Sequence, residues 1–158
     1  MIENEELLYI VPHRGRMLLI SRIKSYNLNE RILEAEYDIT EDCLFYNFSA
    51  AGVPAWAGIE LIAQAISALA GLRGRENGEK PRIGFILSVL SLKIEFPFIQ
   101  AGNTVAIKIR ETDYIDSVHS FEGQIFLKER KILSGNLLVM DVDNEYVESL
   151  KKENAAIE

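Results

Sequence analysis

The chain has 158 residues, of which 48% are hydrophobic and 26% are charged, and its formal net charge is -7. This length and composition predict one globular domain with a core of its own. The acidic balance argues against a nucleic-acid partner, because neutralising phosphates requires a basic surface. Two histidines and one cysteine are too few for a His/Cys zinc site. We therefore expect no metal and no nucleic acid.

No segment of the sequence predicts export or a membrane span. The first six residues are acidic and have no apolar core, so we expect no signal peptide. The most apolar segment, Ile59 to Leu72, carries Glu60 and Gln64 and is too short to cross a bilayer. These features predict a cytoplasmic protein with one domain over residues 1–142 and a polar tail or short helix over residues 143–158.

The amino-terminal part of the chain predicts a short helix or turn and then two strands. The turn covers residues 3–8 and ends before Pro12, because a residue before proline avoids the helical region. The strands cover residues 18–27 and 31–39. The second strand alternates with period two, which is typical of a half-buried antiparallel strand. Its inward side chains are Leu33, Ala35, Tyr37 and Ile39.

An apolar helix is predicted to begin at Pro54, since proline suits the first helical turn. Its apolar residues recur at helical spacing, at Ile59, Ile62, Ala63, Ile66 and Ala70. The opposite stripe carries little charge, so the helix should be buried rather than lie on a surface. Gly71 and Gly74 allow the helix to end, and the polar residues 73–80 predict an exposed loop.

Four more strands are predicted after the loop, at residues 83–96, 104–114, 118–127 and 132–142. In the second of them Val105, Ile107 and Ile109 alternate inward. Runs of strands interrupted by one apolar helix indicate the α+β class, with an antiparallel sheet around the helix. The predicted architecture is therefore a hotdog fold.

Glu60 is a carboxylate on the predicted apolar helix, with Gln64 one turn later. Desolvating a carboxylate is costly unless it is hydrogen-bonded or lines a cavity, and an apolar setting suits a general acid. Gln64 is placed to orient it. The alternative is a carboxylate at the helix end that reaches solvent.

His13 follows Pro12 just before a predicted buried strand. A histidine held there can act as a base near neutral pH, or it can be structural and bond a backbone carbonyl. The second histidine, His119, lies at a strand start, and we expect it to be an ordinary surface or sheet histidine.

Two motifs resemble those of the bacterial 3-hydroxyacyl-acyl-carrier-protein dehydratases, which have the hotdog fold. The first is Pro12-His13-Arg14 followed by Met17-Leu18-Leu19-Ile20 and Arg22-Ile23, which is similar to the opening of these enzymes. The second is Gly58-Ile59-Glu60 with Ala63-Gln64-Ala65, preceded by Pro54. Together with Gly84 to Val89, the helix motif resembles most closely the divergent branch from aryl polyene clusters, the ApeP-like dehydratases. The likeness runs from about Pro12 to Met140.

The resemblance implies dehydration of a 3-hydroxyacyl thioester, bound to acyl carrier protein or coenzyme A, to the trans-2-enoyl thioester in fatty-acid-like or polyene biosynthesis. It implies Glu60 as the acid and no metal or redox cofactor, since the substrate is carried on phosphopantetheine. Amides around Trp56 and Gly58, at the start of the helix, would bind the thioester oxygen. Gln64 would orient Glu60 toward the substrate.

The chain departs from the family in the loop before the helix. The main dehydratases carry a catalytic histidine there, and Asn47 takes its approximate place in this sequence. Asparagine cannot act as a base, so His13 is the nearby candidate for that role, and Asn47 becomes an orienting donor.

Two other functions stay open. An acyl thioesterase of the same fold would use Glu60 as a base on water, and a non-catalytic partner subunit of a heteromeric dehydratase would account for the missing histidine. The family's sites form between subunits, which implies a homodimer, a higher homo-oligomer or a heteromer with a paralogous dehydratase. Carrier proteins are acidic, so a local basic surface is needed for docking. We assign this surface to Arg14, Arg16, Arg22 and Lys24, beside the proposed entrance of the site. A second basic segment in the loop after the helix, with Arg73, Arg75, Lys80 and Arg82, is either a further docking surface or a solvated loop.

Overall fold

The structure, a computed structural model, describes residues 1–142, 146, 148 and 149. Its elements in chain order are β1 (Ile2–Glu3), the 3-10 turns η1 (Asn4–Tyr9) and η2 (Gly15–Met17), β2 (Arg22–Asn27), β3 (Ile32–Asp38), β4 (Gly52–Pro54), the 3-10 turn η3 (Ala55–Ala57), α1 (Gly58–Glu76), β5 (Gly84–Ile94), β6 (Phe98–Gln100), β7 (Thr104–Ile115), β8 (Val118–Leu127) and β9 (Arg130–Asp141).

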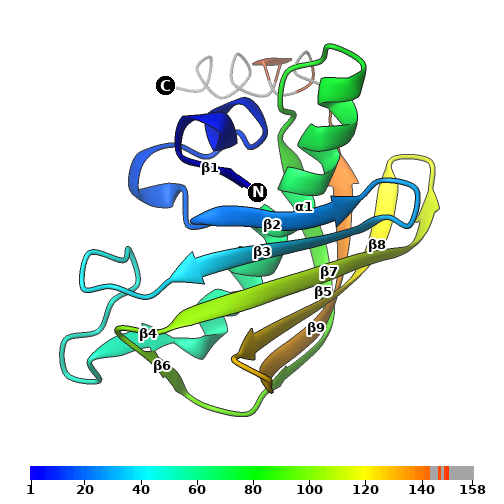
Figure 1. The fold of residues 1–158 in the computed structure, drawn as a ribbon. Helices are drawn as coiled ribbons and strands as arrows, with labels where there is room; N and C mark the ends of the chain where they lie inside the picture. The colour runs from blue at the N-terminus through cyan, green and yellow to red at the C-terminus, as the bar shows by residue number, and fades with distance from the viewer. Residues whose placement is uncertain (143–145, 147, 150–158) are drawn as a thin grey trace, which may run out of the picture.

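One antiparallel sheet wraps around the long helix α1 (Figure 1). Within the described residues its seven strands are ordered β1-β2-β3-β7-β8-β9-β5, and β4 pairs with β6 in a separate two-stranded ribbon. The strand that follows the helix, β5, pairs with β9 and therefore ends the sheet. The predicted α+β class and hotdog architecture are confirmed.

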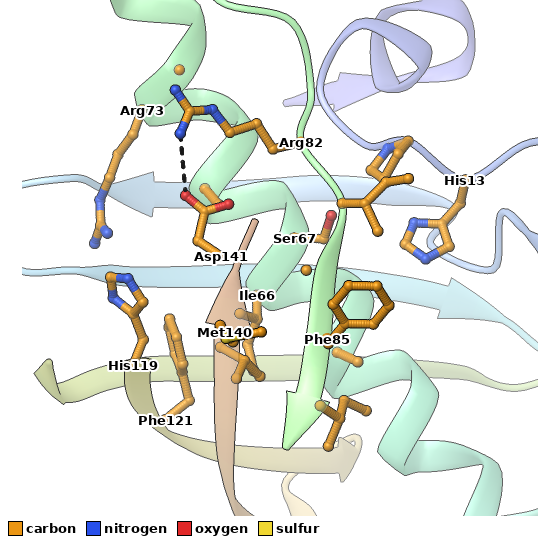
Figure 2. A pocket seen from close by; sticks show the side chains of 18 of the residues that line it. His13, Ile66, Ser67, Arg73, Arg82, Phe85, His119, Phe121, Met140 and Asp141 are labelled. Atoms are coloured by element: carbon orange, nitrogen blue, oxygen red, sulfur yellow. Dashed lines mark ion pairs between the residues drawn. The ribbon is translucent and has the colours of Figure 1, made fainter. Parts of the chain in front are cut away.

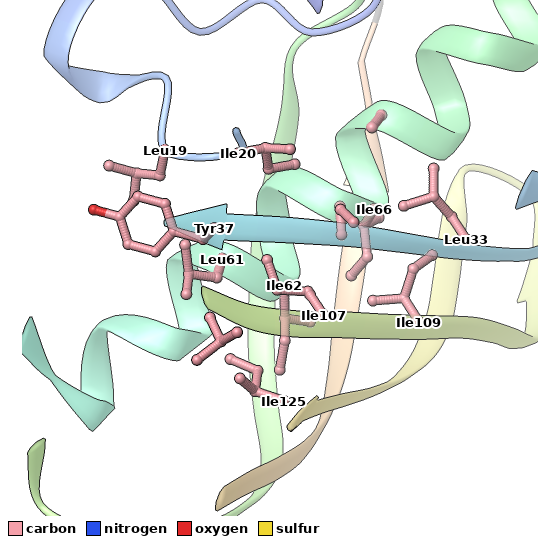
Figure 3. Packing of buried hydrophobic residues seen from close by; sticks show 14 of the residues in the cluster. Leu19, Ile20, Leu33, Tyr37, Leu61, Ile62, Ile66, Ile107, Ile109 and Ile125 are labelled. Carbon is pink, nitrogen blue, oxygen red and sulfur yellow. The ribbon is translucent and has the colours of Figure 1, made fainter. Parts of the chain in front are cut away.

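The core lies between the inner face of the sheet and α1 (Figure 3). Ile62 of α1, Ile107 of β7 and Ile125 of β8 have no exposed surface. Burying such a side chain is worth about 1.5–3 kcal/mol relative to leaving it exposed. The alternation predicted for β3 is confirmed, because its four inward residues are all buried: Leu33, Ala35, Tyr37 and the following Ile39.

Both ends of α1 differ from the prediction. Pro54 ends β4, and a 3-10 turn precedes the helix, which begins only at Gly58. At the other end the helix runs through Gly71 to Glu76, so part of the predicted exposed loop is helical. Gly71 serves close packing rather than termination, because a Cβ there would lie 1.8 Å from the carbonyl oxygen of Ile10.

The segment Ala55–Glu76 is long and apolar enough to pass for a membrane span by length and composition. In its most apolar stretch, however, 67% of the residues are buried inside the protein. This helix is apolar because the sheet encloses it.

Some predicted strand boundaries also shift. The strand predicted over residues 18–27 begins only at Arg22, and β6 was not predicted at all. In the predicted tail, Tyr146, Glu148 and Ser149 are helical, while the rest of residues 143–158 lies outside the described residues.

Candidate functional site

Two of the predicted site residues meet although they are far apart in the sequence. Glu60 lies in the first turn of α1, and His13 lies in the segment between η1 and η2. The His13 Nε2 and Glu60 Oε1 atoms are 3.7 Å apart. Both side chains are partly exposed, at 25% for His13 and 30% for Glu60, so a ligand can reach both.

Gln64 holds this pair together, and its side chain is completely buried. Its Nε2 donates to the Glu60 carboxylate at 2.8 Å and to the carbonyl of Met17 at 2.7 Å. Its Oε1 accepts from the Leu19 amide at 2.9 Å. Gln64 therefore orients Glu60, as predicted from its spacing, and also ties the amino-terminal segment to the helix, which the spacing did not predict.

Burial is the largest influence on His13 and lowers the pKa of its imidazole below the ordinary value of 6.5; Glu60 opposes this shift and Arg14 adds to it. The ring nitrogen Nδ1 is buried and has no hydrogen-bond partner in the described part of the chain. A neutral imidazole is thus favoured at neutral pH, as a general base requires.

Arg14 fixes the turn that carries His13. Its guanidinium donates to the carbonyl of Val11 at 2.6 Å, to that of Leu8 at 2.7 Å and to that of His13 itself at 2.7 Å. Three backbone acceptors leave few donors for a partner protein. The arginine of the Pro12-His13-Arg14 motif therefore has a structural role in this fold.

A cavity of about 540 Å³ opens beside the pair (Figure 2). His13 and Glu60 line it together with apolar side chains from the helix and sheet, among them Ile66, Phe85 and Met140. Figure 2 shows His13 at one side of the pocket and His119 with Arg73 at the other. The space continues from the pair along α1 toward its carboxyl end.

Small residues on one face of α1 make room for this cavity. They recur at helical spacing and all line it: Ala63, Ser67, Ala70 and Gly74. Their side chains do not reach the opposite wall, which β5 and β9 provide through Phe85 and Met140. This explains why Ala63 and Ala70, predicted to face the core, are only half-buried and exposed, respectively.

The start of the helix differs in detail from the predicted oxyanion site. The Gly58 amide donates to the carbonyls of Ala55 and Trp56, so it is not free to bind a ligand. Gly58 also packs tightly, since a Cβ there would lie 2.7 Å from Ile125. Trp56 is exposed at 54% and stands edge-to-face on Phe45 at 5.5 Å.

Within one chain, the fold does not bring Asn47 to the pair of His13 and Glu60. It is exposed and does not line the cavity. Its Oδ1 accepts from the Ala50 amide at 2.9 Å, and its backbone pairs with Gly52. The side chain closes a turn in the aromatic loop, and its Nδ2 is left as a donor.

The predicted docking cations differ in how far their charges are already neutralised. Arg22 forms ion pairs with Glu36 and Asp38, and Lys24 pairs with Glu36 at 3.0 Å. Among the described residues Arg16 has no ion-pair partner and is exposed. Arg14 likewise has no ion-pair partner among the described residues, but its guanidinium is engaged by three backbone carbonyls, so Arg16 is the cation of the four that is left for a partner protein.

The sequence reasoning missed a charged group at the far end of the cavity. The carboxylate of Glu111 is buried and accepts from Arg73 and from His119, whose Nδ1 lies 2.7 Å from Oε1. A signal existed, because Glu111 continues the inward alternation of Val105, Ile107 and Ile109 by one more step. His119, predicted to be an ordinary histidine, lines the cavity.

Comparison with known proteins shows the family and the fold of the chain. Residues 5–151 match the family described as ApeP-like, ApeP dehydratase. The 3-hydroxyacyl-[acyl-carrier-protein] dehydratase FabZ of Chlamydia trachomatis serovar L2 is 25% identical over 146 residues, covering 90% of this chain and 94% of the relative. The FabZ of Chlamydia caviae is 33% identical over 95 residues, or 58% of this chain and 61% of the relative.

Among solved structures, the dehydratase heterocomplex ApeI:P from Xenorhabdus doucetiae has a chain that superposes with a TM-score of 0.82 at 21% identity, covering 91% of this chain and 95% of that one. A hypothetical thioesterase from Streptococcus pneumoniae, solved with coenzyme A, superposes at 0.59 with 11% identity over 77% of this chain and 84% of its own. At these identities the structural matches establish the shared fold.

Proposed function

The chain belongs to the ApeP-like family of dehydratases, and from this premise we propose that it removes water from a 3-hydroxyacyl thioester to form the trans-2-enoyl thioester. The observation that carries the proposal is the approach of His13 Nε2 to Glu60 Oε1, at 3.7 Å, on the wall of the cavity. The setting is fatty-acid-like or polyene biosynthesis in the cytoplasm, with the substrate carried on phosphopantetheine and no metal or redox cofactor.

The pair can supply both proton transfers that the elimination needs. In the reactive form His13 is neutral and Glu60 carries a proton. The Nε2 atom of His13 takes the proton from C2, the C2–C3 double bond forms, and Glu60 protonates the hydroxyl that leaves C3 as water. His13 is then charged and Glu60 is ionised. Because the two groups are neighbours, a proton returning from His13 to Glu60 restores the reactive form.

The thioester oxygen, which becomes enolate-like, requires hydrogen-bond donors. With the Gly58 amide engaged, we assign this role to the amides of Trp56 and Ala57, which lie in the first turn before α1, where amides lack intrahelical partners. The helix dipole adds favourable potential at this end. Asn47 fits its predicted role as an orienting donor only if it is contributed by another subunit.

A second subunit is supported by β5, the last strand of the sheet. Seven of its side chains are large, hydrophobic and between 38% and 60% exposed, namely Phe85, Ile86, Leu87, Val89, Leu90, Leu92 and Ile94. A long, exposed, apolar edge strand pairs readily with another chain. We propose that β5 forms the interface with a second copy or with a paralogous dehydratase. The heterocomplex described for the relative from Xenorhabdus doucetiae favours the paralogue.

Acyl carrier protein is the proposed substrate carrier, with coenzyme A as the alternative. Arg16 is the cation best placed to meet an acidic carrier, since Arg22 and Lys24 are engaged in ion pairs. Arg14 belongs to the predicted docking residues, but we give it only the role of shaping the turn next to Arg16, through its hydrogen bonds to the backbone.

The test is to incubate the purified protein, alone and with a paralogous dehydratase, with 3-hydroxyacyl carrier protein and to measure the products by mass spectrometry. Loss of water supports the proposal. Release of the carrier thiol would identify a thioesterase instead. Loss of water only in the presence of the paralogue, and equally with the Glu60→Gln chain, would make this chain a non-catalytic subunit.

Glu60→Gln provides the decisive variant. Gln retains the size of the side chain but cannot donate the proton that the leaving hydroxyl requires, and general acid–base groups contribute about 10²–10⁴-fold. We expect a loss of that order in kcat with a fold close to wild type. Glu76→Gln, an exposed carboxylate on the same helix, is the matched control and should keep wild-type turnover. Wild-type turnover in Glu60→Gln would end the assignment.

A further inference from the structure

The far end of the cavity carries a polar group that the dehydration chemistry does not use. It consists of Arg73 on α1, Glu111 on β7 and His119 on β8. The Glu111 side chain is 1% exposed, whereas those of Arg73 and His119 are 33% and 22% exposed. Arg73 and His119 line the cavity (Figure 2), whereas Glu111, whose carboxylate joins them, is not among the lining residues.

This arrangement fixes which atoms remain for a ligand. Arg73 and His119 both lower the pKa of Glu111 against the opposing effect of burial, so the carboxylate is ionised and acts only as an acceptor. His119 must therefore carry a proton on Nδ1, and in its neutral form Nε2 is left as an acceptor. Arg73 gives one of its donors to Glu111 and keeps others. The pair can thus donate to a ligand and accept from it.

The charges around this end are largely balanced. Arg82 pairs with Glu79 at 2.8 Å and with Asp141 at 3.6 Å, and Glu111 is neutralised by Arg73. Lys80, which also lines the cavity, is exposed to solvent. A neutral group that both donates and accepts hydrogen bonds, such as a hydroxyl, therefore fits better than an anion.

The distance to the proposed reaction centre limits what can reach this group. Glu60 and Arg73 lie about 20 Å apart along the axis of α1, at 1.5 Å per residue. Apart from the Ser67 hydroxyl, the wall between them is apolar, formed by Ile66, Phe121 and Met140 among others. A ligand that joins the two ends is long, apolar along its length and polar at its tip.

We propose that Arg73 and His119, positioned by Glu111, recognise a hydroxyl at the end of the acyl chain remote from the thioester. This inference rests on the proposed function and defines its substrate class as long 3-hydroxyacyl thioesters with a polar terminus. Arg73 and His119 are then specificity residues for the substrate, and Glu111 is a positioning residue.

The test compares 3-hydroxyhexadecanoyl pantetheine with its 16-hydroxy analogue, whose extended chain approaches the separation of the two ends. Binding is measured by calorimetry in the Glu60→Gln background, where turnover should be blocked, so the result does not depend on catalysis. A net hydrogen bond is worth roughly three- to tenfold in affinity, and we expect the 16-hydroxy analogue to bind tighter by that factor. Equal affinity for the two ligands would overturn the proposal.

Two variants identify the residues. In His119→Asn the side-chain amide can still donate to Glu111 in place of Nδ1, but the acceptor at Nε2 is lost. In Arg73→Lys the charge beside Glu111 stays, but the planar donor set is lost. Each should bring the affinity ratio close to one, while Arg75→Lys, an exposed neighbour on the same helix, should keep it. Circular dichroism verifies that each variant is folded. A ratio retained in both folded variants would also overturn the proposal.

Failure of the inference and failure of the proposed function are separate outcomes. Loss of water from 3-hydroxybutyryl pantetheine, which is too short to reach Arg73, tests the dehydratase chemistry alone. Dehydration of this substrate combined with equal affinity for the two long ligands would remove the terminal-hydroxyl site and leave the dehydratase. A preserved affinity ratio without any dehydration would leave the site and remove the reaction.

Discussion

Replacing Gln64 by leucine tests how the amino-terminal segment is held against the helix. The wild-type side chain is fully buried and bonds the Leu19 amide, the Met17 carbonyl and the Glu60 carboxylate. Leucine fills a similar volume but can form none of these hydrogen bonds. Leu19 is 3% exposed, so its amide would lose its partner without gaining water.

The magnitude follows from the groups left without partners. A buried donor or acceptor without a partner costs about 1–3 kcal/mol. The Leu19 amide should contribute this free-energy cost in full. The carbonyl of Met17 should contribute only part of it, because Met17 is 44% exposed. We expect Gln64→Leu to lower the free energy of unfolding by about 2–4 kcal/mol. Because the same bonds place His13 beside Glu60, kcat should fall by roughly tenfold to a hundredfold, as expected for a misplaced catalytic group.

The assay is urea unfolding followed by circular dichroism, with turnover measured well below the transition. Gln124→Leu is the matched control, because Gln124 is half-buried and its side chain forms no hydrogen bond among the described residues. It should stay within about 0.5 kcal/mol of wild type, as is usual for substitutions away from such features. If Gln64→Leu unfolded at the same urea concentration as this control, Gln64 would not join the segment to the helix.

Three further substitutions test separate parts of the argument. Burial lowers the pKa of His13 below 6.5, so the unfolded state binds the proton more readily, and the stability of the wild type should fall as the pH drops through and below 6.5. The His13→Gln variant should lack this contribution to the fall and should also lack the acid limb of the pH–rate profile. Identical profiles for the two proteins would refute the role of the imidazole. Gly71→Ala would set a Cβ 1.8 Å from the Ile10 carbonyl oxygen and should lower the free energy of unfolding by about 3 kcal/mol or more. Gly74→Ala should be tolerated, because its Cβ would meet no atom closer than 3.5 Å. Equal stability of the two variants in thermal unfolding would contradict the packing role of Gly71. Arg16→Glu should raise KM severalfold for carrier-protein substrate, and less so at high salt, without changing KM for a pantetheine thioester; an equal rise for both substrates would place the arginine in the pocket.

Local patterns in the sequence were sufficient to predict most strands of the main sheet and which side chains of β3 and β7 face inward. Alternation of period two identified the inward side of β3 and β7 because a sheet with one buried face accepts apolar residues only at every second position. The low charge of the segment around Glu60 identified α1 as an enclosed helix for a similar reason. The same contrast, one carboxylate among apolar residues, pointed to Glu60 before any neighbour was known.

The ends of the elements depended on tertiary contacts. Glycine is a poor helix former, so the sequence alone allows the helix to end at Gly71. In the fold, the carbonyl of Ile10 occupies the space next to it, so glycine is required there in the middle of a helix. The choice between the two roles depends on a residue that lies far away in the sequence.

The site itself shows the same division. Residue types nominated His13 and Glu60 as separate candidates, but only the fold brings their side chains to 3.7 Å, through Gln64 bonds to a segment that is remote in sequence. Arg73 and His119 were assigned to a loop and to an ordinary strand position because each looks solvated in its local context. The buried Glu111 draws them together from a helix and a neighbouring strand. Hydrophobic periodicity is a local property of the chain, whereas the pairing of polar groups depends on which strands and helices meet, and that is decided only when the sheet closes around the helix.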